Sequence, residues 1–285
     1  MATTGNSKGG TPVITSTNFC TPGSDLSLHS SDGVEFHVFS RILIEASPVF
    51  RDMLSLPKCG QGGIDGSFSN RVDLAEDAET LDLVLRFLYP ISDPPVSTFD
   101  VLKALLKAAD KYFLEGMIHT LRHILVSPTF VEREPLRVYA VACMYNYEAE
   151  AKIASRHCLK VDIIHEAELY EELAMISARD LLRLIKLHQT RATAILSILA
   201  GSGPSPCGGE PTTAGPLWWI EFKSRAKEEI RTRPLTDVIF SPAFLAGCVN
   251  VGGVCWQCAV NYVSSATQAR LMHLKERIDA LLDTV

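Results

Sequence analysis

Two short runs near the start of the chain alternate apolar and polar residues. They cover residues 25–29 and 34–38, and Asp32-Gly33 lies between them. Alternation with a period of two places every second side chain on the same face of a strand, and an Asp-Gly pair favours a tight turn. The pattern therefore predicts a β-hairpin, and a short run further on predicts another strand at 71–74.

Most of the remaining apolar residues follow the period of a helix. They recur at i, i+3, i+4 and i+7, which gives a helix one apolar face to bury. These stripes predict helices around 81–88, 101–109, 117–125, 136–143, 154–161, 181–199, 219–230 and 271–281. A few strands followed by many helices predict an α+β fold, in which helices cover a small sheet before an all-α extension and a C-terminal helical region.

Local start signals mark three helices. Ser47 precedes a proline, a pair that favours the cap and first turn of a short helix. Ser97 with Asp100 and Ser177 with Asp180 have the spacing of a capping box. We therefore expect helices to begin at these three serines.

Glycine, proline and charge divide the chain into segments. The first 23 residues contain one charged residue and few apolar ones, so we expect a flexible tail. Nine of the sixteen residues at 201–216 are Gly or Pro, a composition that interrupts both helices and strands. The expected segments are a tail at 1–23, an α+β domain at 24–126, a helical extension at 127–200, a linker at 201–216 and a C-terminal helical region at 217–285.

The composition argues against several classes of function. The 285 residues include 27 Lys and Arg against 33 Asp and Glu, a net charge of −6, and the basic residues form no cluster that would bind a row of phosphates. The sequence has neither a long apolar run nor the apolar segment of a signal peptide. Eight cysteines, mostly within helical patterns, are typical of reduced thiols inside the cell. We expect a protein of the cytoplasm or nucleus that binds neither nucleic acid nor membranes.

Residues 24–126 also contain a set of recognisable motifs. The segment begins with Asp25-Leu and continues from Asp32 as Gly-Val-Glu-Phe-His-Val-Phe-Ser-Arg-Ile-Leu-Ile-Glu-Ala-Ser-Pro-Val-Phe-Arg-Asp-Met-Leu. Further along lie Val72-Asp-Leu, Leu88-Tyr89 and a helical pair that begins at Leu102. Together these motifs resemble a BTB/POZ domain, and the whole chain resembles a group of uncharacterised fungal BTB/POZ proteins. The resemblance implies a small sheet covered by helices, with a helical extension of the kind found in adaptor members.

The same resemblance implies a protein–protein interaction module that forms a homodimer or binds another protein. The expected interface lies on the first hairpin and early helices, and its candidate residues are Asp25, Leu26, Leu28, Arg41 and Ile42. In dimeric members of the family, an Asp on the first strand faces a basic residue in a charged pocket. The matching position is Ser40 here, with Arg41 one place later. An ion pair between Asp25 and Arg41 and a purely structural Asp25 at the start of a strand both stay open.

Motifs of the common enzyme classes do not occur in the sequence. It contains no nucleophile elbow, phosphate-binding loop, dinucleotide-binding turn or paired-carboxylate motif, so an interaction protein is favoured over an enzyme. The alternative is a substrate receptor of a cullin-type ubiquitin ligase, which the resemblance also implies. Adaptor members carry an apolar-x-Glu-apolar motif after an early helix, and residues 55–66 do not contain it.

Cysteines near the C-terminus raise a third alternative, a metal-binding or redox protein. Cys255 and Cys258 form the only CxxC motif, and Cys207 and Cys248 would complete four ligands for a structural zinc. A redox pair would need a thioredoxin-like context, whereas free cysteines also pack as small core residues. No cofactor other than this zinc is expected.

Two further features have both a structural and a functional interpretation. His119 and His123 are one helical turn apart, a spacing that can chelate a metal, but no third ligand lies in register. Tyr89 precedes a proline at a helix end, where an aromatic residue either packs in the core or contacts a partner. We favour capping or partial burial for the histidines and core packing for Tyr89.

Overall fold

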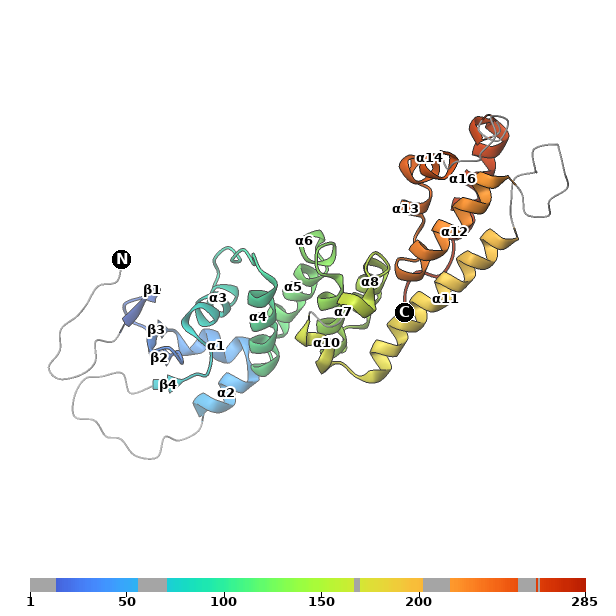
Figure 1. The fold of residues 1–285 in the computed structure, drawn as a ribbon. Helices are drawn as coiled ribbons and strands as arrows, with labels where there is room; N and C mark the ends of the chain where they lie inside the picture. Colours follow the sequence, from blue (N-terminus) through green and yellow to red (C-terminus); the bar gives the residue numbers. More distant parts are fainter. Residues whose placement is uncertain (1–13, 56–70, 167–169, 202–215, 251–259, 261) are drawn as a thin grey trace. The chain divides into compact units, whose positions relative to one another are not determined.

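The computed structural model describes residues 14–55, 71–166, 170–201, 216–250, 260 and 262–285 (Figure 1). The chain divides into two compact units, Met1–Ser127 and Pro128–Val285. The first unit combines a small sheet with helices, and the described part of the second unit contains helices alone. The predicted α+β class, a small sheet followed by many helices, is confirmed.

A four-stranded sheet begins the first unit, with strand order β1-β3-β2-β4. The strands are β1 (Ile14–Cys20), β2 (Leu26–His29), β3 (Val34–Val38) and β4 (Arg71–Asp73). β2 and β3 are antiparallel, with Leu28 opposite Phe36, whereas β1 and β4 run parallel to their neighbours. Gly33 adopts a φ of 87° at the turn, a conformation that glycine tolerates without strain. The predicted hairpin and the predicted strand at 71–74 are confirmed.

Alternation along β2 and β3 separates the two faces of the sheet. One face belongs to the core of the unit and carries Leu26, Leu28, Phe36 and Val38, all at most 1% exposed. The other face is polar and carries Ser27, His29, Glu35 and His37. The hairpin therefore buries its apolar side chains within its own unit.

The helices described in the first unit cover the sequence after the hairpin. They are α1 (Ser40–Ala46), α2 (Pro48–Ser55), α3 (Ala78–Leu88), α4 (Phe99–Lys111) and α5 (Glu115–Leu125). α1 packs against α2, and α4 packs against both α3 and α5. The predicted stripes are buried, as shown by Leu81, Leu85, Leu102, Leu105 and Leu121.

Three local predictions differ from the structure. Residues 14–20 form β1, where the sequence predicts a flexible tail; Phe19, 4% exposed, anchors this strand through contacts with distant residues that composition does not reveal. Residues 1–13 of that tail lie outside the described residues. α1 has no local cap and was therefore not predicted. α4 is capped by Thr98 rather than Ser97, because the Thr98 hydroxyl accepts a hydrogen bond from the Val101 N–H at 3.4 Å.

The described residues of the second unit form helices. They are α6 (Pro128–Val131), α7 (Pro135–Met144), α8 (Glu148–Cys158), α9 (Ile163–Glu166), α10 (Glu171–Met175), α11 (Ala178–Ala200), α12 (Leu217–Thr232), α13 (Thr236–Ile239), α14 (Pro242–Val249) and α16 (Ser265–Asp279). The Ser177 hydroxyl accepts a hydrogen bond from the Asp180 N–H at 3.1 Å, so the predicted cap of α11 is confirmed. Within the described ranges, no helix is both long enough and apolar enough to cross a membrane.

Three aromatic side chains of α12 form the centre of an apolar core in the second unit. They are Trp218, Trp219 and Phe222, and the rings of Trp219 and Phe222 stack with centroids 4.9 Å apart. α11 contributes Ile195 to this core, and α14 and α16 contribute further apolar side chains. Helices on both sides of the predicted linker at 201–216 therefore share one core.

Candidate functional site

Asp25 holds the start of α1. Its carboxylate accepts a hydrogen bond from the Ser40 N–H at 2.7 Å and another from the Ser40 hydroxyl at 2.5 Å. Burial disfavours the charged form of Asp25, but these hydrogen bonds outweigh it and lower the pKa of the carboxyl. Phe39 occupies the N-cap position and offers no side-chain acceptor. Asp25 therefore caps α1 from a different element of the fold.

The alternative of an ion pair between Asp25 and Arg41 is wrong. Arg41 points into solvent, with 88% of its side chain exposed, and its Nη2 lies 3.8 Å from Oε1 of Glu45 one helical turn later. An exposed pair of this kind contributes little to stability. Arg41 and the partly buried Ile42 nevertheless give α1 a surface that a partner can reach.

Leu26 and Leu28 need a correction as interface residues. Both are fully buried in the core of the first unit and leave no exposed area for a second chain. The period-two pattern identifies an apolar face of the hairpin correctly, but it does not say what covers that face. The unit's own core covers this apolar face. Of the five candidates, only Asp25, Arg41 and Ile42 have solvent-exposed area that a partner could contact.

β1 provides an exposed edge of the sheet. It pairs with β3 on one side, and the sheet has no described strand on its other side. The pairing is irregular: Thr15 lies opposite Glu35 and Cys20 opposite His37, with a register shift between them. Ile14 at the start of the strand is 53% exposed. Unpaired N–H and C=O groups along such an edge can accept a strand from another chain.

Two side-chain contacts fix the later half of β1. The Phe19 ring packs edge-on against Tyr89, with centroids 5.2 Å apart, and the Asn18 amide donates a hydrogen bond to Asp82 at 2.8 Å. The Tyr89 hydroxyl accepts a hydrogen bond from the Phe39 N–H at 2.9 Å, and burial raises the pKa of Tyr89. Tyr89 is partly buried and packs within its own unit, as the core interpretation expects. β1 was not predicted, although the run of Thr and Ile before Phe19 is typical of strands.

The polar face of the hairpin contains a serine, two histidines and a carboxylate. The Ser27 hydroxyl donates to Oε1 of Glu35 at 2.5 Å and lies 3.0 Å from Nε2 of His29. Nε2 of His29 and Nε2 of His37 lie 3.4 and 3.6 Å from the same Glu35 oxygen. In a catalytic triad, the carboxylate orients the far nitrogen of the histidine and the serine proton points to the near one. Here the serine proton points to the carboxylate, so the group is arranged as a hydrogen-bond network and not as a nucleophile with its base.

Residues 18–128 match the family model of the BTB/POZ domain, from within β1 to the boundary between the two units. They form a BTB/POZ domain. BTB/POZ domains are in general protein–protein interaction modules, so the chain carries such a module. A comparison of the chain with curated proteins finds no match.

The charged pocket expected of a dimeric BTB/POZ domain is altered in this chain. Ser40 stands where the family has a basic residue, and it meets the Asp25 carboxylate with two hydrogen bonds instead of a positive charge. The buried part of Asp25 is thereby satisfied within one chain. Asp25 is a structural residue of this BTB/POZ domain as well as a candidate at its surface.

The predicted metal ligands are only partly placed. Cys248 lies on α14 within the apolar core, where burial raises the pKa of its thiol. Cys207, Cys255 and Cys258 lie outside the described residues, so the zinc site stays a prediction. In the BTB/POZ domain, the rings of His119 and His123 meet with centroids 4.7 Å apart on α5. Across the described ranges, no three His, Cys, Asp or Glu side chains are placed to hold a metal ion.

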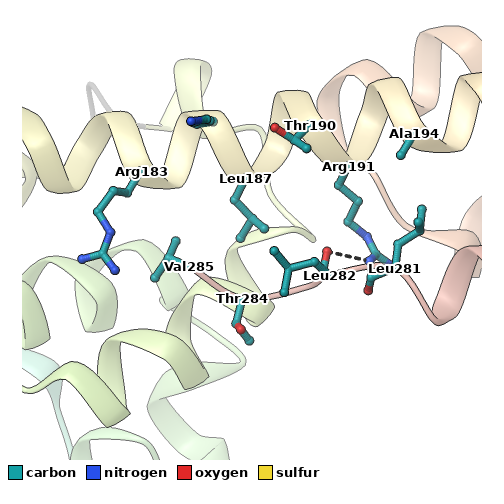
Figure 2. Close-up of a pocket in the computed structure, with 10 residues that line it drawn as sticks. Arg183, Leu187, Thr190, Arg191, Ala194, Leu281, Leu282, Thr284 and Val285 are labelled. Carbon is teal, nitrogen blue, oxygen red and sulfur yellow. Dashed lines mark hydrogen bonds between the residues drawn. The ribbon is translucent and has the colours of Figure 1, made fainter.

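Beyond the BTB/POZ domain, Arg191 on α11 is a buried cation that the sequence analysis did not find. Its side chain is 4% exposed and donates to four backbone carbonyls. The acceptors are Pro234 at 2.9 Å, Leu281 at 2.7 Å, Leu282 at 3.0 Å and Ile278 at 3.3 Å. Figure 2 shows Arg191 beside Leu281 and Leu282. Ile278 lies in the last turn of α16 and Leu281 and Leu282 follow its C-terminal end, where a positive charge complements the helix dipole. Burial lowers the pKa of the guanidinium, which still remains charged at neutral pH.

Proposed function

We propose that this protein is a non-enzymatic interaction protein, which associates with a second copy of itself or with another protein through its BTB/POZ domain. The observation that carries the proposal is the edge of β1 that no described strand covers, together with the exposed Ile14 at its start. A strand from a partner would satisfy the open backbone groups of this edge, and burial of apolar side chains would add to the binding free energy. The surface of α1 around Arg41 and Ile42 is the second element that we assign to the interface.

A homodimer is the first form of association to test. Its two-fold symmetry would bring the same edge of both chains together, so each β1 would gain a partner strand. Stable interfaces bury about 1,200–2,000 Å² in total, and a strand pair supplies part of that area. The absence of a basic residue at position 40 removes one charge from the pocket, which makes apolar and backbone contacts the main source of affinity.

Light scattering on the full chain at about 50 µM, a concentration that reveals even a weak dimer, tests this proposal. We expect a mass near twice the 31.3 kDa of one chain. Ile14→Lys places a charge at the interface and should weaken the dimer by at least about tenfold. Ile91→Lys is the matched control, because Ile91 is equally exposed in the same unit, at 52%, but lies outside the sheet.

Two outcomes would contradict the homodimer. One is a single-chain mass for the wild-type protein at that concentration, and the other is an equal effect of Ile14→Lys and Ile91→Lys. Affinity purification with mass spectrometry would then test association with another protein. A stoichiometric complex with a purified cullin would favour the ligase-receptor alternative, whose required motif does not occur in residues 55–66.

A further inference from the structure

An apolar cavity of about 340 Å³ lies between α11 and the segment that follows α16 (Figure 2). Leu187 and Ala194 face it from α11, and Leu281, Leu282 and Val285 face it from the C-terminal segment. Binding cavities for small molecules usually measure about 300–1,000 Å³ and are mostly apolar with a few polar groups. The size and lining of this cavity fit that description.

The C-terminal wall of the cavity is held in place from two sides. Arg191 binds the carbonyls of Leu281 and Leu282. Beyond them, the Val285 N–H donates to the Ser155 hydroxyl at 3.1 Å, and Asp283 forms a 2.8 Å ion pair with Arg156. The cavity is therefore formed before any ligand arrives, which keeps the entropic cost of binding low.

The charged side chains that line the apolar cavity itself are all basic. Its lining includes Lys186 and Arg183 but no Asp or Glu side chain. The nearby Asp283 lies outside the lining and forms an ion pair with Arg156. Within the described part of the chain, Lys186 makes no hydrogen bond or ion pair. Arg183 has one distant partner, Asp180, at 3.7 Å. Both cations are thus available to an anionic group at the mouth of an apolar cavity.

A second, polar cavity of about 470 Å³ adjoins the first and shares Arg183 and Val285 with it. Its other charged lining residues are Lys152 and Arg179 and the acidic Glu148 and Asp180, so its charges are mixed. Arg183 thus lies where an apolar space meets a polar one. A ligand with an apolar chain and an anionic head would place its chain in the apolar space and its head beside Arg183.

We propose that this site binds an aliphatic carboxylate. Its chain occupies the apolar cavity, and its carboxylate lies between Lys186 and Arg183. A cavity of about 150 Å³ suffices for benzene, so a cavity of roughly twice that volume holds a chain of about ten carbons. Each buried methylene adds to the hydrophobic stabilisation of the complex, which favours a medium-length chain over acetate. The site lies in the second unit and does not depend on association through the BTB/POZ domain.

Calorimetric titration of the full chain with decanoate, compared with decan-1-ol, tests the proposal. We expect saturable binding of decanoate at least tenfold tighter than that of the alcohol, which has the same chain but no charge. The double variant Lys186→Gln with Arg183→Gln should bind the two compounds equally. Lys227→Gln is the control, because Lys227 is an exposed cation on α12 outside both cavities and should leave binding unchanged.

Filling the cavity provides a second, independent variant. Ala194→Phe should weaken the binding of decanoate and of decan-1-ol together, while circular dichroism shows that the helices persist. Equal affinity of the wild-type protein for acid and alcohol would overturn the proposal. So would the absence of saturable binding up to about 1 mM decanoate, or the same loss with Lys227→Gln as with the double variant.

Discussion

The two units of the chain offer a contrast between charged or titratable groups that bind the backbone near the surface and those that bind it inside the fold. In the BTB/POZ unit, carboxylates near the surface receive N–H groups at helix starts: Asp25 binds Ser40, and Asp32 accepts from the Ala78 N–H at 2.9 Å. In the second unit, Arg191 and His188 are 4% and 7% exposed and bind backbone carbonyls inside the fold.

This difference predicts how much stability each unit loses when one of these polar side chains is replaced. When a capping carboxylate near the surface is removed, water can still reach the freed N–H groups, so the loss of stability is small. When a buried cation is removed, its acceptors stay buried without any partner, and the full desolvation cost appears. The second unit should therefore respond far more strongly than the first to the loss of a single polar group.

Replacement of Arg191 should have the largest effect. We expect Arg191→Met to lower the free energy of unfolding of the second unit by about 3–5 kcal/mol, because four carbonyls lose their donor while the methionine chain keeps much of the packing. Urea unfolding followed by tryptophan fluorescence measures this unit alone, since all three tryptophans, Trp218, Trp219 and Trp256, lie in it.

A matched arginine in the same unit serves as the control. Arg231 lies on α12 in an exposed ion pair with Glu228, 3.2 Å away, so Arg231→Met should change stability by less than about 1 kcal/mol. Similar losses of unfolding free energy for the two variants would show that the buried hydrogen bonds of Arg191 stabilise the second unit no more than an exposed ion pair does.

Acid should affect the second unit before the first. Burial lowers the pKa of His188 to about 4, and one ring nitrogen lies 3.0 Å from the Cys158 carbonyl. Between pH 6.5 and 4 the unfolded chain binds a proton that the folded chain does not, so stability falls as the pH falls. The loss amounts to about 3 kcal/mol for His188. Glu76 of the first unit, whose pKa is lowered, loses its contribution only below about pH 4.5.

Urea midpoints from tryptophan fluorescence at pH 7, 6, 5 and 4 measure the acid response of the second unit. His188→Gln removes the titrating group and should flatten most of the slope in this range. A smaller slope should persist, because burial also lowers the pKa of His157 in the same unit. An unchanged slope in His188→Gln would contradict the assignment to this histidine.

The smallest of the three effects is expected at the cap of α1. Asp25→Ala should destabilise the first unit by about 1 kcal/mol, the usual cost of losing an N-cap. Hydrogen exchange at the Ser47 N–H, which bonds to the Leu43 carbonyl at the end of α1, gives a local measurement. Asp93→Ala in an exposed loop is the control and should leave exchange unchanged. Loss of protection in both variants would mean that Asp25 has no special role.

The elements that the sequence predicts best are those whose stabilising partners lie nearby in the chain. The hairpin around Gly33 follows from alternation and turn chemistry, and α11 follows from a long stripe with Ser177 as its cap. By contrast, α1 is capped by Asp25 from the start of the neighbouring strand β2, and β1 is held by Phe19 against Tyr89. No local sequence pattern predicts these contacts, because the residues that make them are far apart in the sequence.

The candidate site divides in the same way. The family motifs indicated three residues that have solvent-exposed area, namely Asp25, Arg41 and Ile42. The other two candidates, Leu26 and Leu28, are buried in the core. Sequence patterns identify an apolar face but not its partner. The Arg191 clamp could not be predicted either, because a single arginine within a helical stripe is usually an exposed residue.

The contacts of Arg191 also bear on the order in which the second unit forms. Its partner carbonyls lie 43 to 91 residues later in the sequence. At a synthesis rate of about 5–20 residues per second, α11 waits roughly 5–20 s for the end of α16. Until then its apolar stripe lacks the contacts with α16, and chaperones often bind nascent chains with such exposed apolar surface. Contacts of such long range form late, so the clamp should slow unfolding more than it speeds folding.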